Sequence, residues 1–291
     1  MNKLSSTKRA QILMALIEGN SIASTCRMTG AAKMTVLSLV REVGEACLSF
    51  HDANVRGLVT ERVQCDEVWS FCYAKERNVP AKLKGKEGFG SIWTWTALDA
   101  DSKLMISWIV SDRSQNAANA IIGDLKSRVT RRIQITSDGL SQYQEAVIRA
   151  FRPGEADHAE VIKVYASSKP SKDVSPNSAA SRYSPGRLLS VEKRAAFGEP
   201  DAAHASTSYM ERWNLTLRMQ NRRFTRLTNG FSKKLENHSY MIAITMVYYN
   251  FCRKHRSLKG QTPAMMAGLT EYQWTASDLL ALDMWNASAA A

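Results

Sequence analysis

The chain lacks the long apolar runs that are typical of membrane proteins. None of its apolar stretches reaches the roughly 20 residues that a membrane-spanning helix requires. The richest stretch, residues 240–251, is too short and is flanked by Lys and Arg. No apolar signal-peptide core precedes Ser21. We therefore expect a soluble, cytoplasmic protein without a membrane partner.

Cysteine is scarce and scattered through the 291 residues. The five cysteines are Cys26, Cys47, Cys65, Cys72 and Cys252, and no two of them form a CxxC pair. An odd number of dispersed cysteines is typical of reduced thiols that pack in a core. The pattern argues against a disulfide scaffold and against a zinc site of the CxxC type.

Acidic residues are nearly absent from one segment of a chain whose net charge is +12. Residues 205–260 carry 11 Lys and Arg but only two acids, whereas residues 261–291 carry three acids and no Lys or Arg. With so few acids, the basic segment cannot be balanced by i,i+4 ion pairs along a helix. A basic block of this kind indicates a polyanionic partner such as DNA.

The N-terminal segment has the pattern of a helix-turn-helix. A helix, a short helix that Ser21 can cap, a turn containing Gly30 and a third helix over 33–47 follow one another. We expect residues 1–50 to form a DNA-binding domain whose third helix enters the major groove. The polar residues expected to read bases are Lys33, Thr35, Ser38 and Arg41. The alternative is a three-helix bundle that packs only against the rest of the protein.

The remainder of the chain predicts a ribonuclease-H-like α/β domain. After a linker over 51–62, the order is three strands, helix, strand, helix, strand and then helices, which is typical of a mixed sheet with helices on both faces. We assign this catalytic domain to residues 63–260 and a C-terminal tail to 261–291. The segment 167–208 is rich in Ser, Pro and Ala and predicts a long irregular insertion.

Three carboxylates stand where this architecture can bring them together. Asp66 interrupts an apolar strand, Asp138 ends another strand, and Glu211 opens a basic helix. Such a set can hold two divalent ions, Mg²⁺ or Mn²⁺, and support an in-line displacement at phosphorus. Because strand side chains alternate, we expect Glu67 to point away from Asp66 and the metals. Each acid also has a structural reading, since Asp138 can cap a turn and Glu211 can favour a helix dipole.

Several motifs resemble those of bacterial DDE transposases of the insertion sequence 1 family. The segments that carry the resemblance are 65–71, 136–139, 207–219, 221–229, 248–255 and 262–265. The resemblance implies Mg²⁺-dependent cutting and joining of DNA ends, with Asp66, Asp138 and Glu211 as the catalytic and metal-binding triad.

The basic residues near the third acid predict contacts with DNA. If the helix that starts near Glu211 continues, Arg218, Arg222 and Arg226 share one face and can clamp phosphates, with Arg223 beside them. The alternative is a solvated face. His255 lies in a basic run and is either a contact to the scissile phosphate or a surface histidine.

Together these features predict a DNA transposase. Its partners would be double-stranded DNA, in the form of terminal inverted repeats and target, and at least one further copy of the chain, because two ends must be processed. Its place would be the bacterial nucleoid in the cytoplasm. One alternative is a ribonuclease-H-type nuclease that cuts without joining. The other is a non-catalytic helix-turn-helix repressor that retains an inactive core.

Overall fold

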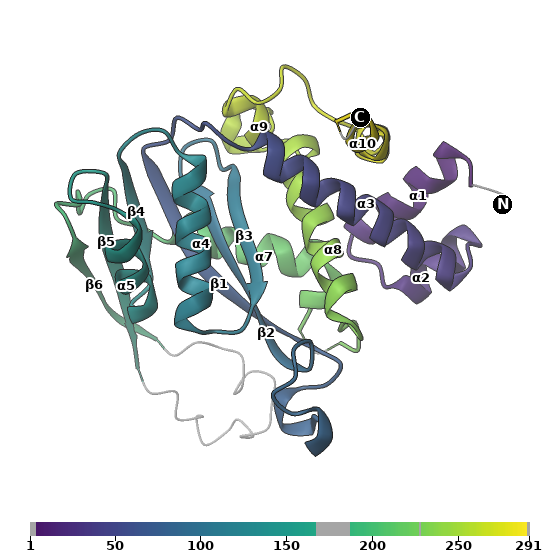
Figure 1. Ribbon diagram of the computed structural model, residues 1–291, viewed down its shortest axis with the longest axis horizontal. Helices are drawn as coiled ribbons and strands as arrows, with labels where there is room; N and C mark the ends of the chain where they lie inside the picture. The colour runs from purple at the N-terminus through teal and green to yellow at the C-terminus, as the bar shows by residue number, and fades with distance from the viewer. Residues whose placement is uncertain (1–3, 167–186, 227, 290–291) are drawn as a thin grey trace.

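A six-stranded mixed sheet forms the centre of the protein (Figure 1). The computed structural model describes residues 4–166, 187–226 and 228–289. The strands are β1 (Arg62–Cys72), β2 (Gly90–Asp99), β3 (Met105–Ser111), β4 (Ile133–Ser137), β5 (Ala156–Tyr165) and β6 (Leu188–Phe197). Their order across the sheet is β3-β2-β1-β4-β5-β6. Strands β1, β4 and β5 run parallel, and β2 and β6 pair antiparallel with their neighbours.

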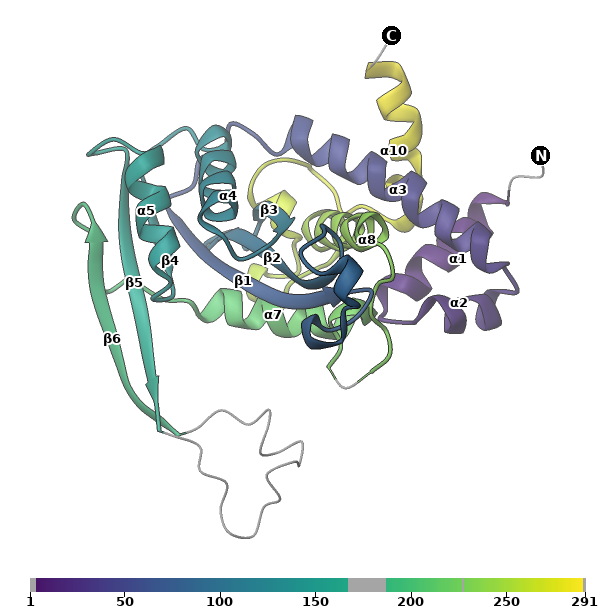
Figure 2. The ribbon, with the colours of Figure 1, turned by 60° about the horizontal axis from the view of Figure 1, so that its bottom comes forward.

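Helices cover both faces of this sheet. They are α1 (Ser6–Ile17), α2 (Ile22–Thr29), α3 (Lys33–Asn54), α4 (Gln115–Arg128), α5 (Ser141–Ala150), α7 (Ser208–Gln220), α8 (Leu235–Val247), α9 (Pro263–Met266) and α10 (Ala276–Ala289). Figure 2 shows α4 and α5 on one face and α7 on the opposite face. One core contains Cys65 and Ile121, and a second contains Val68 and Trp213. The architecture is compatible with a ribonuclease H-like fold, as the element order predicts.

The N-terminal segment forms three helices with the predicted turn at Gly30, but the third helix continues to Asn54, beyond its predicted end at residue 47. Ser5 and Ser21 accept backbone N–H bonds at the starts of α1 and α2, and Gly30 ends α2 in the left-handed region with φ of 68°. Gly30 suits this turn because it has no Cβ to clash there. The expected linker over 51–62 begins later than predicted, since residues 51–54 continue α3.

The N-terminal helices share one hydrophobic core with the rest of the protein. Buried residues of α1 and α3 belong to the same cluster as residues of the sheet, α4, α8 and α10. Helix α3 packs against α8 so closely that a Cβ added at Gly44 would lie 2.8 Å from the Cα of Tyr240. This shared core lies between the parts that the sequence predicts as separate domains.

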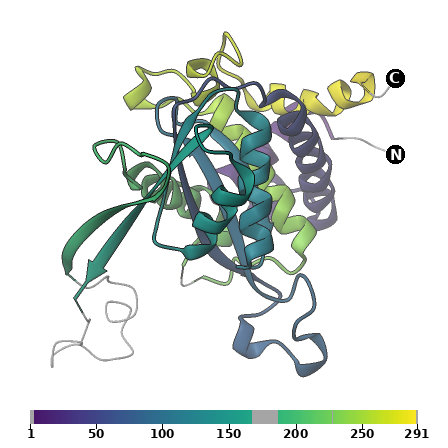
Figure 3. The ribbon, with the colours of Figure 1, turned by 60° about the vertical axis from the view of Figure 1, so that its left-hand side comes forward.

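The expected irregular insertion contains a strand. Residues 188–197 form β6, which pairs antiparallel with β5, while residues 167–186 lie outside the described part of the chain. The prediction missed β6 because residues 188–195 are exposed and carry no alternating apolar pattern. Figure 3 shows the β5–β6 hairpin extending away from the helices.

A helix that spans a membrane must be both long and apolar. Within the described ranges, no helix is long and apolar enough to cross a bilayer.

Candidate metal centre

Three carboxylates meet where β1 and β4 separate. Asp66 and Glu67 lie in β1, and Asp138 directly follows β4. One carboxylate oxygen from each residue lies within 4.8 Å of the other two. The structure therefore brings together two of the three acids that the sequence singles out, Asp66 and Asp138, and adds Glu67.

The topology of the sheet creates this meeting point. Strand β4 pairs with β1 only as far as Gln64, so the β1 edge beyond it is open. At this edge the backbone N–H of Glu67 donates to Asp66 Oδ1 at 2.8 Å. The chain turns away after β4, where the N–H of Leu140 donates to Asp138 Oδ1 at 3.0 Å. Ligand sites at the carboxyl ends of parallel strands are a general feature of open α/β sheets.

The prediction that Glu67 lies away from the other acids is wrong. Glu67 does contact residues on the other side of β1, accepting from Arg113 Nε at 2.9 Å and from the Tyr143 hydroxyl at 3.3 Å. Because β4 no longer covers this edge, the longer Glu side chain also brings an oxygen close to Asp66 and Asp138. The alternation of strand side chains sets the face from which a side chain leaves the backbone. At an edge that no neighbouring strand covers, a side chain as long as Glu can still extend to the other face.

Burial makes ionisation of Asp66 and Glu67 unfavourable. Loss of hydration raises the pKa of Asp66 to about 6, and the neighbouring Asp138 charge adds to the rise. Asn214 Nδ2 opposes it by donating to Asp66 Oδ2 at 2.6 Å. Burial likewise raises the pKa of Glu67 to about 7, assisted by the charges of Asp138 and Asp66. The hydrogen bonds and positive charges around the cluster therefore do not offset the cost of ionising Asp66 and Glu67.

This environment fits a divalent cation. Mg²⁺ and Mn²⁺ prefer carboxylate oxygens, and the three ligand atoms come from Asp and Glu alone. A bound cation would supply the positive charge that lets Asp66 and Glu67 ionise despite burial. Zinc, which prefers His and Cys ligands, is a poorer match to this set of donors.

Glu211 lies outside this group of three acids. Its side chain on α7 is 54% exposed, forms an ion pair with Lys163 of β5 and accepts from Thr207 Oγ1 at 3.1 Å. The α7 residue that contacts Asp66 is instead Asn214, one turn further along the helix. The structure thus places Glu211 next to β5.

The start of α7 is fixed by β1 itself. The Gln64 side chain accepts from the backbone N–H groups of Tyr209 and Met210 at 3.0 and 3.2 Å. Free N–H groups at a helix start need such acceptors. Since Gln64 and Asp66 are two residues apart on one strand face, the same contact holds Asn214 above Asp66. Sequence reasoning missed both amides, although Asn214 is visible three residues after Glu211 on the same helix.

The prediction that Arg218, Arg222 and Arg226 share one face of a continuous helix is wrong. Helix α7 ends at Gln220, and Arg222–Phe224 form a 3₁₀ turn. The helix ends because Asn221 turns its side chain into the protein, where its Nδ2 donates to Thr245 Oγ1 at 3.1 Å. Three of the arginines nevertheless line one cavity of about 910 Å³, namely Arg218, Arg223 and Arg226. Arg222 lies against Gly230 instead.

The residues predicted to read bases lie along α3. Lys33, Ser38 and Arg41 are exposed, and Thr35 is partly buried. Arg41 Nε lies 4.0 Å from Oε1 of Glu45, which is one turn further along α3.

His255 belongs to a different environment from the acids. Its ring packs edge-to-face on Tyr249, with centroids 4.8 Å apart. Burial, together with the charges of Arg253 and Lys103, lowers the pKa of His255 to about 4. The imidazole is therefore neutral at pH 7, so a contact with a phosphate would be a hydrogen bond rather than an ion pair.

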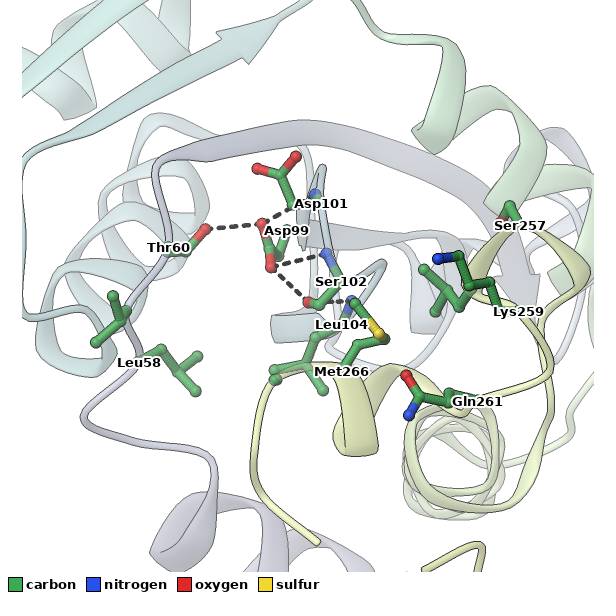
Figure 4. A pocket seen from close by; sticks show the side chains of 13 residues that line it. Leu58, Thr60, Asp99, Asp101, Ser102, Leu104, Ser257, Lys259, Gln261 and Met266 are labelled. Carbon is green, nitrogen blue, oxygen red and sulfur yellow. Dashed lines mark hydrogen bonds between the residues drawn. The ribbon is translucent and has the colours of Figure 1, made fainter. Parts of the chain in front are cut away.

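A second cavity of about 600 Å³ contains another acid, Asp99 (Figure 4). Its carboxylate accepts from Thr60 Oγ1 at 2.8 Å and from the backbone N–H of Ser102 at 3.1 Å, as well as from the Ser102 hydroxyl. These bonds hold the turn between β2 and β3. Because its acceptors are used within the protein, Asp99 is a structural residue.

Comparison with solved structures gives a remote likeness, whereas comparison with sequences gives none. No protein-family model matches the chain, and no curated protein sequence matches it. Among solved structures, the chain is similar to a piggyBac transposase in a synaptic complex with hairpin DNA. The TM-score is 0.36 at 12% identity, over 98% of this chain and 73% of that chain.

Proposed function

We propose that this protein is a metal-dependent phosphoryl transferase that acts on DNA, and specifically a transposase of the insertion sequence 1 type. The observation that carries the proposal is the group formed by Asp66, Glu67 and Asp138 at the open junction of β1 and β4. A cluster of three acids in which two, Asp66 and Glu67, have a raised pKa is expected where a cation binds during function. The motif resemblance and the basic segment over 205–260 favour DNA as the substrate.

The chain's own residues would hold the ions and the DNA. Asp66 and Asp138 are the central ligands for Mg²⁺ or Mn²⁺, with Glu67 beside them and Glu211 as the third acid of the predicted triad. When bound, two such ions lower the pKa of an attacking water or 3′-hydroxyl and neutralise charge on the leaving oxygen. Asn214 orients Asp66 through its 2.6 Å hydrogen bond. Lys163 must release Glu211 before that carboxylate can take part.

DNA binding is assigned to two surfaces. The exposed face of α3, with Lys33, Ser38 and Arg41, is proposed to recognise the element ends, together with the partly buried Thr35. Arg218, next to the acids, is proposed to hold the backbone near the scissile phosphate. The chain would act as a dimer or larger assembly, because transposition joins two ends.

The test is strand cleavage and joining. The full chain would be incubated with Mn²⁺ and duplexes carrying the sequences that flank its coding region. We expect nicking at a defined position and transfer of the pre-cut 3′ end to a second duplex. Asp66→Asn and Asp138→Asn should lose both reactions and keep DNA binding. If cleavage occurs without joining, the protein is a nuclease. If Asp138→Asn cleaves like the wild type, the proposed centre is wrong.

A further inference from the structure

The 910 Å³ cavity is lined by β1 residues that follow the acidic cluster, and apart from Arg218 none of its lining residues has a role in the proposed function. Trp69, on its wall, follows Asp66 by three residues in β1, which corresponds to about 10 Å along a strand. Arg218 lines the cavity and is close enough to Asp66 to lower its pKa. At about 3.4 Å per nucleotide in a duplex strand, the cavity lies roughly three nucleotides from the acids.

One wall of the cavity is aromatic. The Trp69 side chain is 43% exposed, and its Nε1–H donates to Ser91 Oγ at 3.1 Å, which fixes the ring. The Trp69 and Phe71 centroids are 5.7 Å apart, and those of Phe71 and Phe231 are 4.8 Å apart with an interplanar angle of 31°. A large aromatic ring that is held in place yet open to solvent offers a π-face to a planar ligand.

The same cavity also has a basic lining. Arg223 lines the cavity, and among the described residues no carboxylate lies within ion-pair distance of it. Its Nε is buried and has no hydrogen-bond acceptor in the described part of the chain. Burial lowers the pKa of Arg223 to about 10, so the guanidinium stays charged at pH 7. A buried, charged group without an acid partner is costly unless an anion completes it.

A cavity with both aromatic and basic lining residues suits a ligand that has a planar ring and a negative charge. A nucleotide has this chemistry, with a base that stacks and a phosphate that accepts from Arg. The volume falls within the range of about 300–1,000 Å³ that is typical of ligand sites. A base inside a duplex is stacked and paired, so only an unpaired one could enter.

We propose that this cavity receives an unpaired nucleotide of the DNA strand beside the cleavage site, with its base on Trp69 and its phosphate near Arg218 and Arg223. The proposal deepens the proposed function and rests on it. It assigns to the cavity the separation of the strands next to the cut, which brings the scissile phosphate to the acids in a single strand.

The test uses three fluorescent probes with the full-length chain in EDTA. They are a blunt 20-base-pair duplex, the same duplex with a four-thymidine tail, and the same duplex with a four-residue abasic tail. The two tails carry the same phosphates, so their comparison isolates the bases. We expect the wild type to bind the thymidine tail about tenfold more tightly than the abasic tail, which is about 1.4 kcal/mol and within the range for base stacking on an aromatic side chain.

Variants of the aromatic wall give the decisive readout. Trp69→Ala should bind both tails alike, Trp69→Phe should keep most of the preference, and Tyr272→Ala, an exposed aromatic outside the cavity, should behave as wild type. Arg223→Met should weaken both tailed probes without changing their ratio. Thermal unfolding shows whether each variant is folded.

Four outcomes would overturn the proposal. The first is equal binding of the two tails by the wild type, and the second is an unchanged preference in Trp69→Ala. In both cases, intact binding of the blunt duplex and of Mn²⁺ would leave the proposed function standing. The third is binding of none of the DNA probes, which would refute the proposed function as well. Tighter binding of an acidic peptide than of the tailed duplex would assign the cavity to a protein partner.

Discussion

The acidic cluster should make the metal-free protein less stable than it would be without one of its charges. Asp66→Asn removes a carboxylate whose pKa is raised from 3.8 to about 6. That shift corresponds to about 3 kcal/mol, and partial exposure of Asp66 to water reduces our expectation to about 2 kcal/mol. For a chain of 291 residues, this is a rise of about 3 °C in the midpoint of thermal unfolding.

The local hydrogen bonds allow the substitution. An Asn at this position keeps one oxygen for the Glu67 N–H. Its new N–H₂ group would face Asn214, whose Oδ1 is buried and has no partner among the described residues. A flip of the Asn214 amide therefore restores the second bond. The charge is removed without adding to the number of unsatisfied polar atoms, because the flip only exchanges the places of Asn214 Oδ1 and Nδ2.

The pH dependence follows from the direction of the shift. An acid with a raised pKa holds its proton in the folded state while the unfolded chain has already lost it. The free energy of unfolding therefore falls as the pH rises from about 4 to about 6, and the loss persists above pH 6. The gain from Asp66→Asn should be complete at pH 8 and should vanish near pH 4.

The assay is thermal unfolding in EDTA at pH 8, 6 and 4, repeated with Mn²⁺ at pH 8. The cation should raise the midpoint of the wild type and have little effect on Asp66→Asn, which reverses the order of stability. Asp101→Asn, an exposed acid outside the cluster, is the control. An Asp66→Asn midpoint equal to or below that of the wild type in EDTA at pH 8 would refute the reasoning.

Three further predictions test other parts of the account. Lys163→Met should tighten Mn²⁺ binding several-fold if Glu211 is a ligand, and titration of Mn²⁺ showing no change would leave Glu211 out of the centre. Gly44→Ala should lower the free energy of unfolding, measured in urea, by about 1–3 kcal/mol, because the added Cβ would overlap Tyr240. An unchanged urea midpoint would contradict the close packing of α3 against α8. Arg41→Ala should reduce the preference for end sequences over random duplex about tenfold in gel shifts, while equal loss on both would indicate only a backbone contact.

The sequence predicted those helices and strands whose burial produces a recognisable pattern of apolar residues. The strands containing Asp66 and leading to Asp138 are buried on both faces, so their apolar runs were visible. Strand β6 left no such trace because its first eight residues are exposed and its pairing with β5 is made by the backbone. The shared core of α3 and α8 was also hidden, since a contact such as Gly44 with Tyr240 joins residues that are far apart in the chain.

The candidate site was only partly predictable for a similar reason. Asp66 and Asp138 follow from strand position, but the closeness of Glu67 depends on where β4 stops pairing with β1, which is a property of the folded sheet. The end of α7 at Gln220 depends on the bond of Asn221 to Thr245. Continued helical spacing therefore suggested an arginine stripe that the chain does not form.

The most direct test of the central claim is a count of bound Mn²⁺ by electron paramagnetic resonance at pH 8. We expect saturable binding of up to two ions by the wild type, with binding lost or strongly weakened in Asp66→Asn and Asp138→Asn and kept in Asp101→Asn. Absence of saturable binding, or equal binding by all four proteins, would contradict the assignment of Asp66, Glu67 and Asp138 as a metal centre.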